Sequence, residues 1–255
     1  MLRDTALILR SELAVAIRNR AWLFMGMIQP VMYLLLFGPL LVRIAASTPG
    51  FPPGGAWKVL TPGLIIQLAL FNSVFSGYSV LSDHKSGVLE RLRVTPVNRS
   101  ALILGRVLVT VGLTLGQAVV LLGLTTLVFH LRVPVLGILL VLVIATFVAI
   151  SLAACSNALA LILKNDSTFS SLLNIILLPL GLLSGILVPI TAALAPRWLW
   201  VLSRFNPLAY LVDVARAVFR NDLSGRSLLT ATAVLAGMTV LSVWWGTRTY
   251  QRENG

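Results

Sequence analysis

The fold is decided by the stretch VLGILLVLVIATFVAISLAACSNALALIL, residues 135–163, which contains no charged residue. An α-helix needs about 20 consecutive apolar residues to cross the hydrocarbon core of a bilayer. This stretch is longer than that minimum, so a helix formed by it has room to tilt or to break within the membrane. It predicts a transmembrane helix.

The composition of the whole chain supports the same interpretation. Of its 255 residues, 58% are hydrophobic and only 11% are charged, whereas a soluble domain is about 45–50% apolar and about 25% charged. A water-soluble globular enzyme is therefore excluded. We expect a single all-α membrane domain over residues 1–255.

Five further apolar stretches flank the first one, so we predict a polytopic protein with six transmembrane helices. The six tryptophans lie at or near the ends of these stretches, as expected for side chains at a membrane–water interface. The predicted spans are residues 22–42, 59–81, 107–129, 135–163, 170–190 and 228–246.

Two segments outside the spans are predicted to lie at the membrane surface. In residues 1–21, Arg3, Arg10 and Arg18 recur at helical spacing and share one face, which predicts an amphipathic interfacial helix. The outer loop, residues 191–227, mixes charged residues with tryptophans and aliphatic residues. We expect it to form a re-entrant or interfacial helical hairpin before the last span.

The basic residues are interpreted by their positions. Twenty Lys and Arg against eight Asp and Glu give a net charge of +12, which in a soluble protein suggests nucleic-acid binding. Here they lie between apolar stretches, where they orient the spans and contact lipid phosphates. We therefore expect contacts with membrane lipid, no nucleic-acid partner, and both termini in the cytoplasm.

The loop at residues 82–106 contains the sequence Asp83-HKSGVLERLRVT-Pro96. Val88, Leu89 and Leu92 would form one apolar side of a short helix that ends at Thr95–Pro96. Such a helix, with charged edges, suits docking into a groove of a soluble partner. A solvated loop helix is the alternative.

Residues 83–99 closely resemble the cytosolic loop of type-2 ATP-binding-cassette (ABC) permeases, whose pattern is roughly E-x-x-x-G-T-L-E-R-L-x-x-T-P-x-x-R. The chain departs from it at Val88, where threonine is common, and at residues 83–85, which replace the usual acidic and basic run. The element NPLAYLVDVAR, residues 206–216, is similar to a second family element that precedes the last span. Within the family, the chain most resembles daunorubicin-resistance-type drug exporter permeases.

This resemblance implies a non-catalytic permease subunit of an ATP-driven exporter in the bacterial inner membrane, moving a hydrophobic drug, antibiotic or lipid-like compound out of the cell. It implies pairing with a second permease, an identical copy or a relative, and with two cytosolic ATPase subunits that bind ATP and Mg²⁺; no cofactor is expected in this chain. The residues implied for ATPase coupling are Gly87, Val88, Leu89, Glu90, Arg91, Leu92, Arg93, Thr95 and Pro96. Those implied for the outer hairpin are Asn206, Pro207, Tyr210, Asp213 and Arg216.

The residues themselves are compatible with these implications. No G-x-x-x-x-G-K-[ST] phosphate loop occurs, so ATP hydrolysis is expected in a partner. In the family, the dimer seam involves the first and fifth spans. Gly181 and Gly185 in the fifth span form a small-xxx-small pair that could serve this seam, with packing inside one chain as the alternative.

Polar and aromatic residues within the spans mark a candidate substrate pathway. Gln67, Phe71 and Phe75 follow each other at intervals of four, so one helix face offers an amide and two rings to a flat, partly apolar compound. Pairing of amides between helices and packing of rings against lipid are the alternatives. The candidate pathway residues are Gln29, Tyr33, Gln67, Phe71, Asn72, Phe75 and Asn174.

Two other functions fit the sequence less well. A stand-alone secondary transporter or channel usually needs an ionisable residue within the membrane, and we expect no buried Asp, Glu, Lys or Arg in any span. An intramembrane enzyme needs paired catalytic groups at depth, and the spans offer none. Asp213 and Arg216, three residues apart, are expected to form a solvated ion pair worth a few tenths of a kcal/mol.

Overall fold

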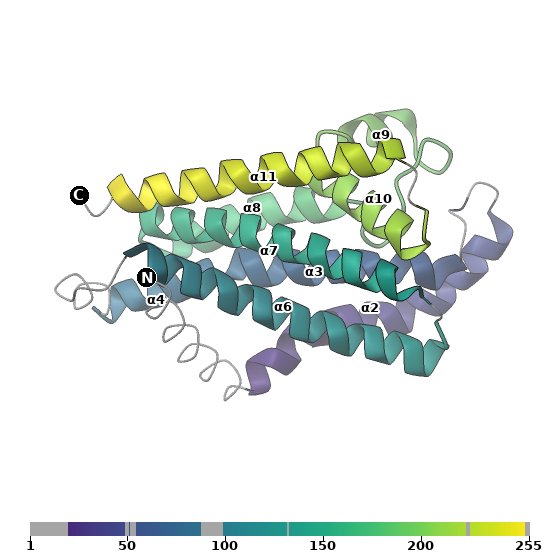
Figure 1. Cartoon of the computed structure of the whole chain (residues 1–255), viewed down its shortest axis with the longest axis horizontal. Coiled ribbons are helices and arrows are strands. Elements are labelled where there is room, and N and C mark those ends of the chain that lie inside the picture. The colour runs from purple at the N-terminus through teal and green to yellow at the C-terminus, as the bar shows by residue number, and fades with distance from the viewer. Residues whose placement is uncertain are drawn as a thin grey trace.

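The computed structural model describes residues 20–48, 51, 55–87, 99–131, 133–222 and 225–252. Over these residues it is helical with no strand, which confirms the all-α prediction. The long helices run along the long axis of the molecule (Figure 1). The helices are α2 (Arg20–Ser47), α3 (Gly55–Phe75), α4 (Gly77–Lys85), α6 (Arg99–Phe129), α7 (Val135–Leu163), α8 (Asp166–Leu182), α9 (Arg197–Ser203), α10 (Pro207–Phe219) and α11 (Gly225–Arg252).

Four segments among the described residues are long and apolar enough to cross a membrane: Gly26–Ser47, Gly55–Lys85, Leu104–Phe129 and Val135–Leu163. They correspond to the first four predicted spans. The apolar helix α8 is shorter and ends at Leu182, before the predicted end of the fifth span. The fifth and sixth spans remain predictions.

The long helices alternate in direction, so the bundle has two distinct ends. The start of α6 and the Arg252 end of α11 lie at the same end as α4, which we call the α4 end, and α2 begins on the side facing this end (Figure 1). Helices α9 and α10 lie at the opposite end, which we call the α10 end. This arrangement agrees with termini on one side of the membrane, although the side itself remains a prediction.

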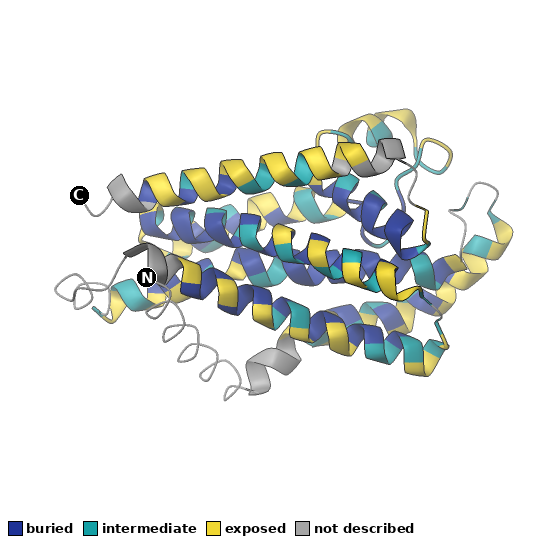
Figure 2. Ribbon diagram, viewed as in Figure 1, coloured by how far each residue is buried: buried dark blue, intermediate teal, exposed yellow. Residues whose placement is uncertain are grey.

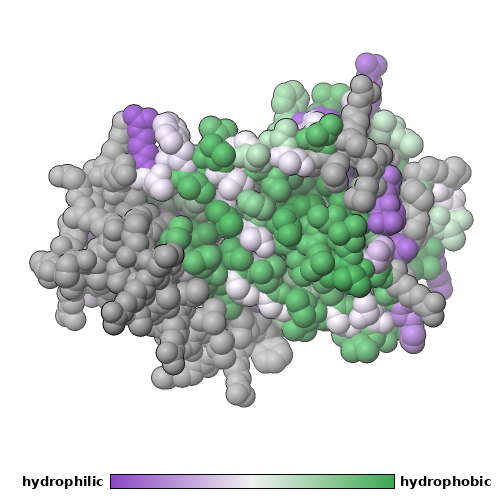
Figure 3. All heavy atoms as spheres, in the orientation of Figure 1, coloured by the Kyte–Doolittle hydropathy of each residue, from purple (hydrophilic) through white to green (hydrophobic). Residues whose placement is uncertain are grey.

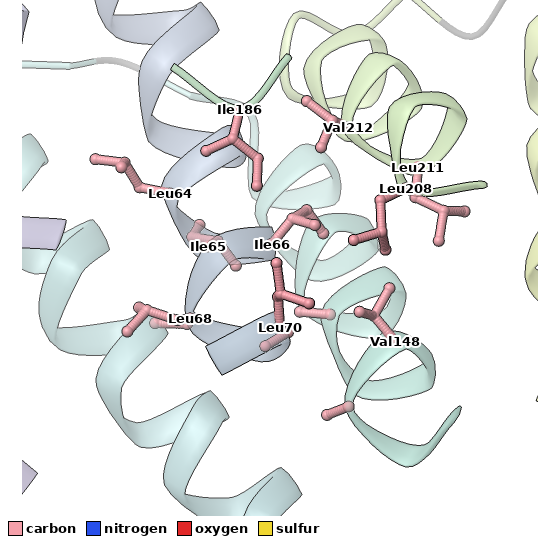
Figure 4. Packing of buried hydrophobic residues seen from close by; sticks show 14 of the residues in the cluster. Leu64, Ile65, Ile66, Leu68, Leu70, Val148, Ile186, Leu208, Leu211 and Val212 are labelled. Atoms are coloured by element: carbon pink, nitrogen blue, oxygen red, sulfur yellow. The ribbon is translucent and has the colours of Figure 1, made fainter. Parts of the chain in front are cut away.

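Helix α3 is the centre of the bundle. It packs against α2, α6, α7 and α10, and its residues 59–70 are buried without exception. Around it, Ile66 and Leu70 face side chains of α7 and α10, whereas Leu64 and Leu68 point to the opposite side of α3 (Figure 4). A helix buried on every side is apolar all round, which explains why the sequence of α3 shows no polar stripe.

The outer surface of the bundle is also apolar. Buried residues line the inside of each helix and exposed residues its outside (Figure 2), yet many exposed residues are Leu, Ile and Val. Figure 3 shows apolar side chains across the middle of one face and hydrophilic ones towards its two ends. Such a belt is expected where lipid, rather than water, surrounds the protein.

The predicted second span, residues 59–81, is interrupted at Ser76, where α3 ends and α4 begins. A Cβ atom on Gly77 would come within 2.5 Å of the Phe169 ring and 2.7 Å of Ser156 Oγ, so only glycine fits there. The Gly77 N–H donates to Ser156 Oγ at 3.1 Å, and Ser76 Oγ donates to the Ser73 carbonyl at 2.7 Å. The break is therefore held against α7.

The glycine pair expected in the fifth span does not form a helical motif. Gly181 lies in α8, but α8 ends at Leu182, and Gly185 follows in a turn with φ of +69°. The two residues therefore do not share a helix face, and the prediction of a small-xxx-small pair is wrong. A Cβ atom on Gly181 would meet nothing within 4 Å, so this part of α8 is open. A dimer contact there remains a prediction.

Two predicted segments lie outside the described residues. They are residues 1–19, which make up nearly all of the interfacial helix, and residues 88–98, which hold all but the first of the coupling residues.

Candidate functional site

A pocket of about 430 Å³ lies between α2, α3, α4 and α6, towards the α4 end. Four residues of the predicted substrate pathway line it: Gln29, Phe71, Asn72 and Phe75. The structure thus brings together residues from two predicted spans. The remaining lining residues are Gly26, Ser76, Tyr78, Ser79, Arg106, Val109, Thr110 and Leu113.

Aromatic rings form one wall of the pocket. The Phe71 and Phe75 ring centroids are 6.0 Å apart, and those of Phe75 and Tyr78 are 6.1 Å apart, with 21° between the ring planes in each pair. Tyr78 also meets the edge of Phe169, 5.0 Å away. The spacing of four residues predicts the two phenylalanines; Tyr78, a polar residue of the same predicted span, joins them from beyond Ser76.

The polar groups of the pocket are partly engaged within the chain. Asn72 Nδ2 donates to Gln117 Oε1 at 2.7 Å and to Thr114 Oγ1 at 3.2 Å, which joins α3 to α6. Gln29 Nε2 donates to the Tyr33 hydroxyl at 3.2 Å. For Asn72, the alternative in which amides bind one another between helices is therefore correct.

Three predicted pathway residues do not line the pocket. Gln67 is buried inside the bundle, and its Oε1 has no hydrogen-bond partner. Tyr33 contacts Gln29 from the next turn of α2, and Asn174 is exposed on α8. The predicted face of Gln67, Phe71 and Phe75 is split because α3 is enclosed up to Leu70 and borders the pocket only from Phe71 onward.

Arg106 corrects the expectation that no span contains a buried charge. The sequence pattern places Arg106 in the loop before the third span, but α6 begins at Arg99 and carries Arg106 into the apolar stretch Leu104–Phe129, where it is 7% exposed. Its Nη2 donates to the Asp83 carboxylate of α4. Its Nη1 is buried and has no hydrogen-bond partner. Apolar residues on both sides of Arg106 set the helix boundary, and the ion pair makes its burial possible.

Helix α4 is tied to two neighbours by charge. Asp83 binds Arg106 of α6, and Lys85 binds Asp166 in the first turn of α8. Gly87, the first predicted coupling residue, follows with φ of +68°, a conformation that favours glycine. The segment that leads into the predicted coupling residues is therefore linked to α6 and α8.

At the α10 end, Arg216 is 2% exposed and binds backbone carbonyls. Its Nε donates to Val59 O at 2.9 Å, and its Nη2 donates to Gly185 O at 2.7 Å and to Ile186 O at 2.9 Å. Its Nη1 lies 4.0 Å from Asp213 Oδ1. The expectation of a solvated ion pair is wrong, because the turn after α8 and the start of α3 enclose this guanidinium.

The other predicted hairpin residues position α10. Asn206 Oδ1 accepts from the Leu208 N–H at 3.0 Å, while Asn206 Nδ2 donates to Leu180 O at 2.8 Å. Pro207 occupies the first position of α10, where its missing N–H costs nothing. The motif thus caps α10 and attaches it to the end of α8.

Arg204 connects the remaining two hairpin residues. It lies over the Tyr210 ring, 5.3 Å from the centroid, and its Nη1 is 3.4 Å from Asp213 Oδ2. Burial raises the pKa of Asp213 despite the opposing charges of Arg216 and Arg204. Burial also lowers the pKa of Arg216 to about 10, which leaves it charged at neutral pH.

The model of the ABC-2 type transporter family matches residues 3–219 of the chain. A protein of Porphyra purpurea named "Putative transport permease ycf38" is 26% identical over 206 residues, covering 80% of this chain and 69% of its own length. Its namesake in Pyropia yezoensis is 28% identical over 223 residues, covering 84% of this chain and 72% of its own length. The namesake in Cyanophora paradoxa is 25% identical over 206 residues, covering 80% and 70%.

Proposed function

The chain belongs to the ABC-2 type transporter family, and from this premise we propose that it is the membrane subunit of an ATP-driven exporter. The cargo is a hydrophobic drug, antibiotic or lipid-like compound that leaves the cell. A separate cytosolic ATPase supplies the energy, and a second permease, identical or related, completes the transporter. The family assignment made from residues 83–99 is confirmed, whereas the partners, direction and cargo belong to the proposal.

The pocket is the observation that supports this cargo. Its volume of about 430 Å³ falls in the range of drug-sized binding sites, which are mostly apolar with a few placed polar groups. The wall formed by Phe71, Phe75 and Tyr78 offers stacking surface. Gln29 and Ser79 are exposed polar residues at its border.

Helix α4 supports the proposed coupling to an ATPase. The segment after it holds the predicted docking residues, while α4 itself contributes Tyr78 and Ser79 to the pocket. A displacement imposed on residues 88–96 would reach the pocket wall through α4. Energy supplied outside the membrane could in this way change the affinity for cargo, as transport requires.

The proposal is tested by purifying the tagged chain from native membranes in mild detergent and measuring bound ATPase. We expect an ATPase subunit to co-purify, and Leu92→Ala or Glu90→Ala to reduce its amount and uncouple transport from hydrolysis. Arg248→Ala is the matched control, because Arg248 is exposed on α11 towards the same end of the bundle.

Two results would contradict the proposal. One is a chain that elutes alone, without ATPase activity, from membranes in which the ATPase has been looked for. The other is ion- or proton-driven uptake by the purified chain in liposomes without ATP. Either result would favour the stand-alone transporter or channel.

A further inference from the structure

We propose that the pocket binds amphiphiles that carry one acidic group, and that Arg106 recognises this group. The inference rests on the proposed function, because it defines the class of compound that occupies the same pocket. It rests on three observations: the charges that line the pocket, the incomplete hydrogen bonding of Arg106, and the order of polar and apolar residues along the pocket wall.

The charge of the pocket wall has one sign. Arg106 is the charged side chain among the lining residues, and none of the lining residues is acidic. Asp83, which binds Nη2, offsets much of the charge of Arg106, so the preference for an anionic ligand over a cationic one rests on the unpaired Nη1 group. The net charge of +12 on the chain acts in the same direction at longer range.

The hydrogen bonding of Arg106 leaves one donor, Nη1, without an acceptor, and because Nη1 has almost no exposed surface, a ligand reaches it only when the side chain turns towards the pocket. Asp83 accepts from Nη2, but Nη1 is buried without a partner. A buried donor without an acceptor is unfavourable, and a carboxylate or phosphate oxygen is the acceptor that a guanidinium binds most strongly. A neutral apolar compound in the pocket would leave Nη1 unsatisfied.

The polarity of the lining residues changes along the bundle axis. Ser79 belongs to α4 and Arg106 lies near the start of α6, both at the α4 end, whereas Leu113 lies about two turns further along α6 and Phe71 lies in α3. At 1.5 Å per residue, Arg106 and Leu113 are about 10 Å apart along α6. The order fits a compound with a headgroup at the α4 end and an aromatic or aliphatic body beside Phe71 and Phe75.

Two sources can supply this chemistry: an acidic compound that is transported, or a membrane lipid with an anionic headgroup. Both present a carboxylate or phosphate joined to an apolar body. The experiment therefore measures the shared chemistry first and separates the two sources afterwards.

The test measures binding of 1-pyrenebutyrate and of neutral 1-pyrenebutanol to the full chain in phosphatidylcholine nanodiscs, with empty nanodiscs subtracted. The two probes share the ring and differ in charge. We expect pyrenebutyrate to bind more tightly. Arg106→Gln should weaken pyrenebutyrate binding by at least about tenfold, as expected for loss of a charge-assisted hydrogen bond, and change pyrenebutanol binding less than about twofold.

Control variants guard against loss of fold. Arg43→Gln removes an exposed arginine of α2 away from the pocket and should leave both probes unchanged. Phe75→Ala should weaken both probes to the same extent, because it removes a ring of the wall and no charge. The double variant Asp83→Asn/Arg106→Gln removes both charges and should repeat the selective loss if Arg106→Gln alone does not fold.

The proposal is overturned if wild-type protein binds the two probes equally, or if Arg106→Gln weakens both alike. Replacing part of the phosphatidylcholine with phosphatidylglycerol then identifies the source: reduced pyrenebutyrate binding indicates a lipid-headgroup site, and unchanged binding indicates an acidic cargo. This assay needs no ATPase. Absence of the ATPase from the pull-down would therefore contradict the exporter alone, and loss of charge selectivity would contradict Arg106 recognition alone.

Discussion

Arg106 and Arg216 are both buried, at opposite ends of the bundle, but they are held in different ways. Arg216 donates to the main-chain carbonyls of Val59, Gly185 and Ile186. Arg106 donates to the side chain of Asp83, which is 27% exposed. Main-chain acceptors move only with the backbone, whereas a partly exposed carboxylate can turn to water at small cost. We infer that the contacts around Arg216 at the α10 end are rigid, whereas those around Arg106 at the α4 end can rearrange.

This difference predicts that Arg216 and Arg106 contribute differently to stability and to function. Removing one partner of a buried, hydrogen-bonded charge costs about 3–5 kcal/mol when the remaining groups stay buried and unpaired. The carbonyls around Arg216 would stay buried, but Asp83 has access to solvent. Arg216 is therefore expected to matter chiefly for folding, and Arg106 chiefly for what the pocket binds.

The largest effect is expected from Arg216→Met. It leaves three carbonyls without their donor and should lower the free energy of unfolding by about 3–5 kcal/mol, or the melting temperature by about 10 °C. Thermal unfolding followed by size-exclusion chromatography in detergent measures it. Arg197→Met, at an exposed position of α9, is the control. If Arg216→Met melts at the same temperature as the control, Arg216 is not needed for stability, and the distinction between Arg216 and Arg106 fails.

Gly63→Ala tests how closely the residues around Arg216 are packed. A Cβ atom at this position would lie 2.5 Å from Ile186 O, the carbonyl that Arg216 also binds. Crowding of this kind costs about 1–3 kcal/mol. Gly116→Ala is the matched control, because a Cβ atom there meets nothing within 4 Å, and helix propensity predicts a gain of up to about 1 kcal/mol. Equal melting temperatures for the two variants would show that the contact between residue 63 and Ile186 accommodates an added methyl group.

A double-mutant cycle of Asp83→Asn and Arg106→Gln measures the pair at the α4 end. We expect Arg106→Gln to lower the unfolding free energy by about 1–2 kcal/mol, clearly below the loss for Arg216→Met, because Asp83 has access to solvent. Asp83→Asn leaves the charge of Arg106 buried and unpaired and should cost more, about 3–5 kcal/mol. Chemical or thermal unfolding in detergent gives the three differences. A loss for Arg106→Gln as large as that for Arg216→Met would mean that the α4 end is equally rigid.

The smallest effect is expected from Asp213→Asn. Because burial raises the pKa of Asp213, protonation is more favourable in the folded state, so its contribution to stability is present at low pH and lost as the pH rises through the folded pKa. Asp213 is 42% exposed, so water screens the effect, and the variant should stay within about 0.5 kcal/mol of wild type at pH 7. A melting-temperature series between pH 4 and pH 8 checks this. A large loss of stability at pH 7 would mean that Asp213, rather than the three carbonyls, stabilises the buried guanidinium of Arg216.

Much of the fold follows from local sequence. The uncharged run at residues 135–163 predicted α7, and apolar stretches predicted three more spans close to their observed bounds. Spacing of four residues placed Phe71 and Phe75 on one face, and both line the pocket. These features depend on composition and helical period within one segment.

The remaining features depend on contacts between distant segments. The break at Ser76 follows from the approach of Gly77 to Ser156 and Phe169 in other helices, which no local pattern reveals. Local sequence places Arg106 in a loop because a charge near a span end usually lies outside the span. Its burial depends on Asp83, which comes from α4. The available signal for its burial is that apolar residues lie on both sides of Arg106 in the sequence.

The break at Ser76 has a geometric consequence. Helix α4 has nine residues and is therefore about 13 Å long, so a tilt of about 10° at its first residue moves the Lys85 end by about 2 Å. Phe75 lies on one side of the break and Tyr78 on the other. A rotation of this kind would therefore also change the spacing of the two rings and with it the width of the pocket.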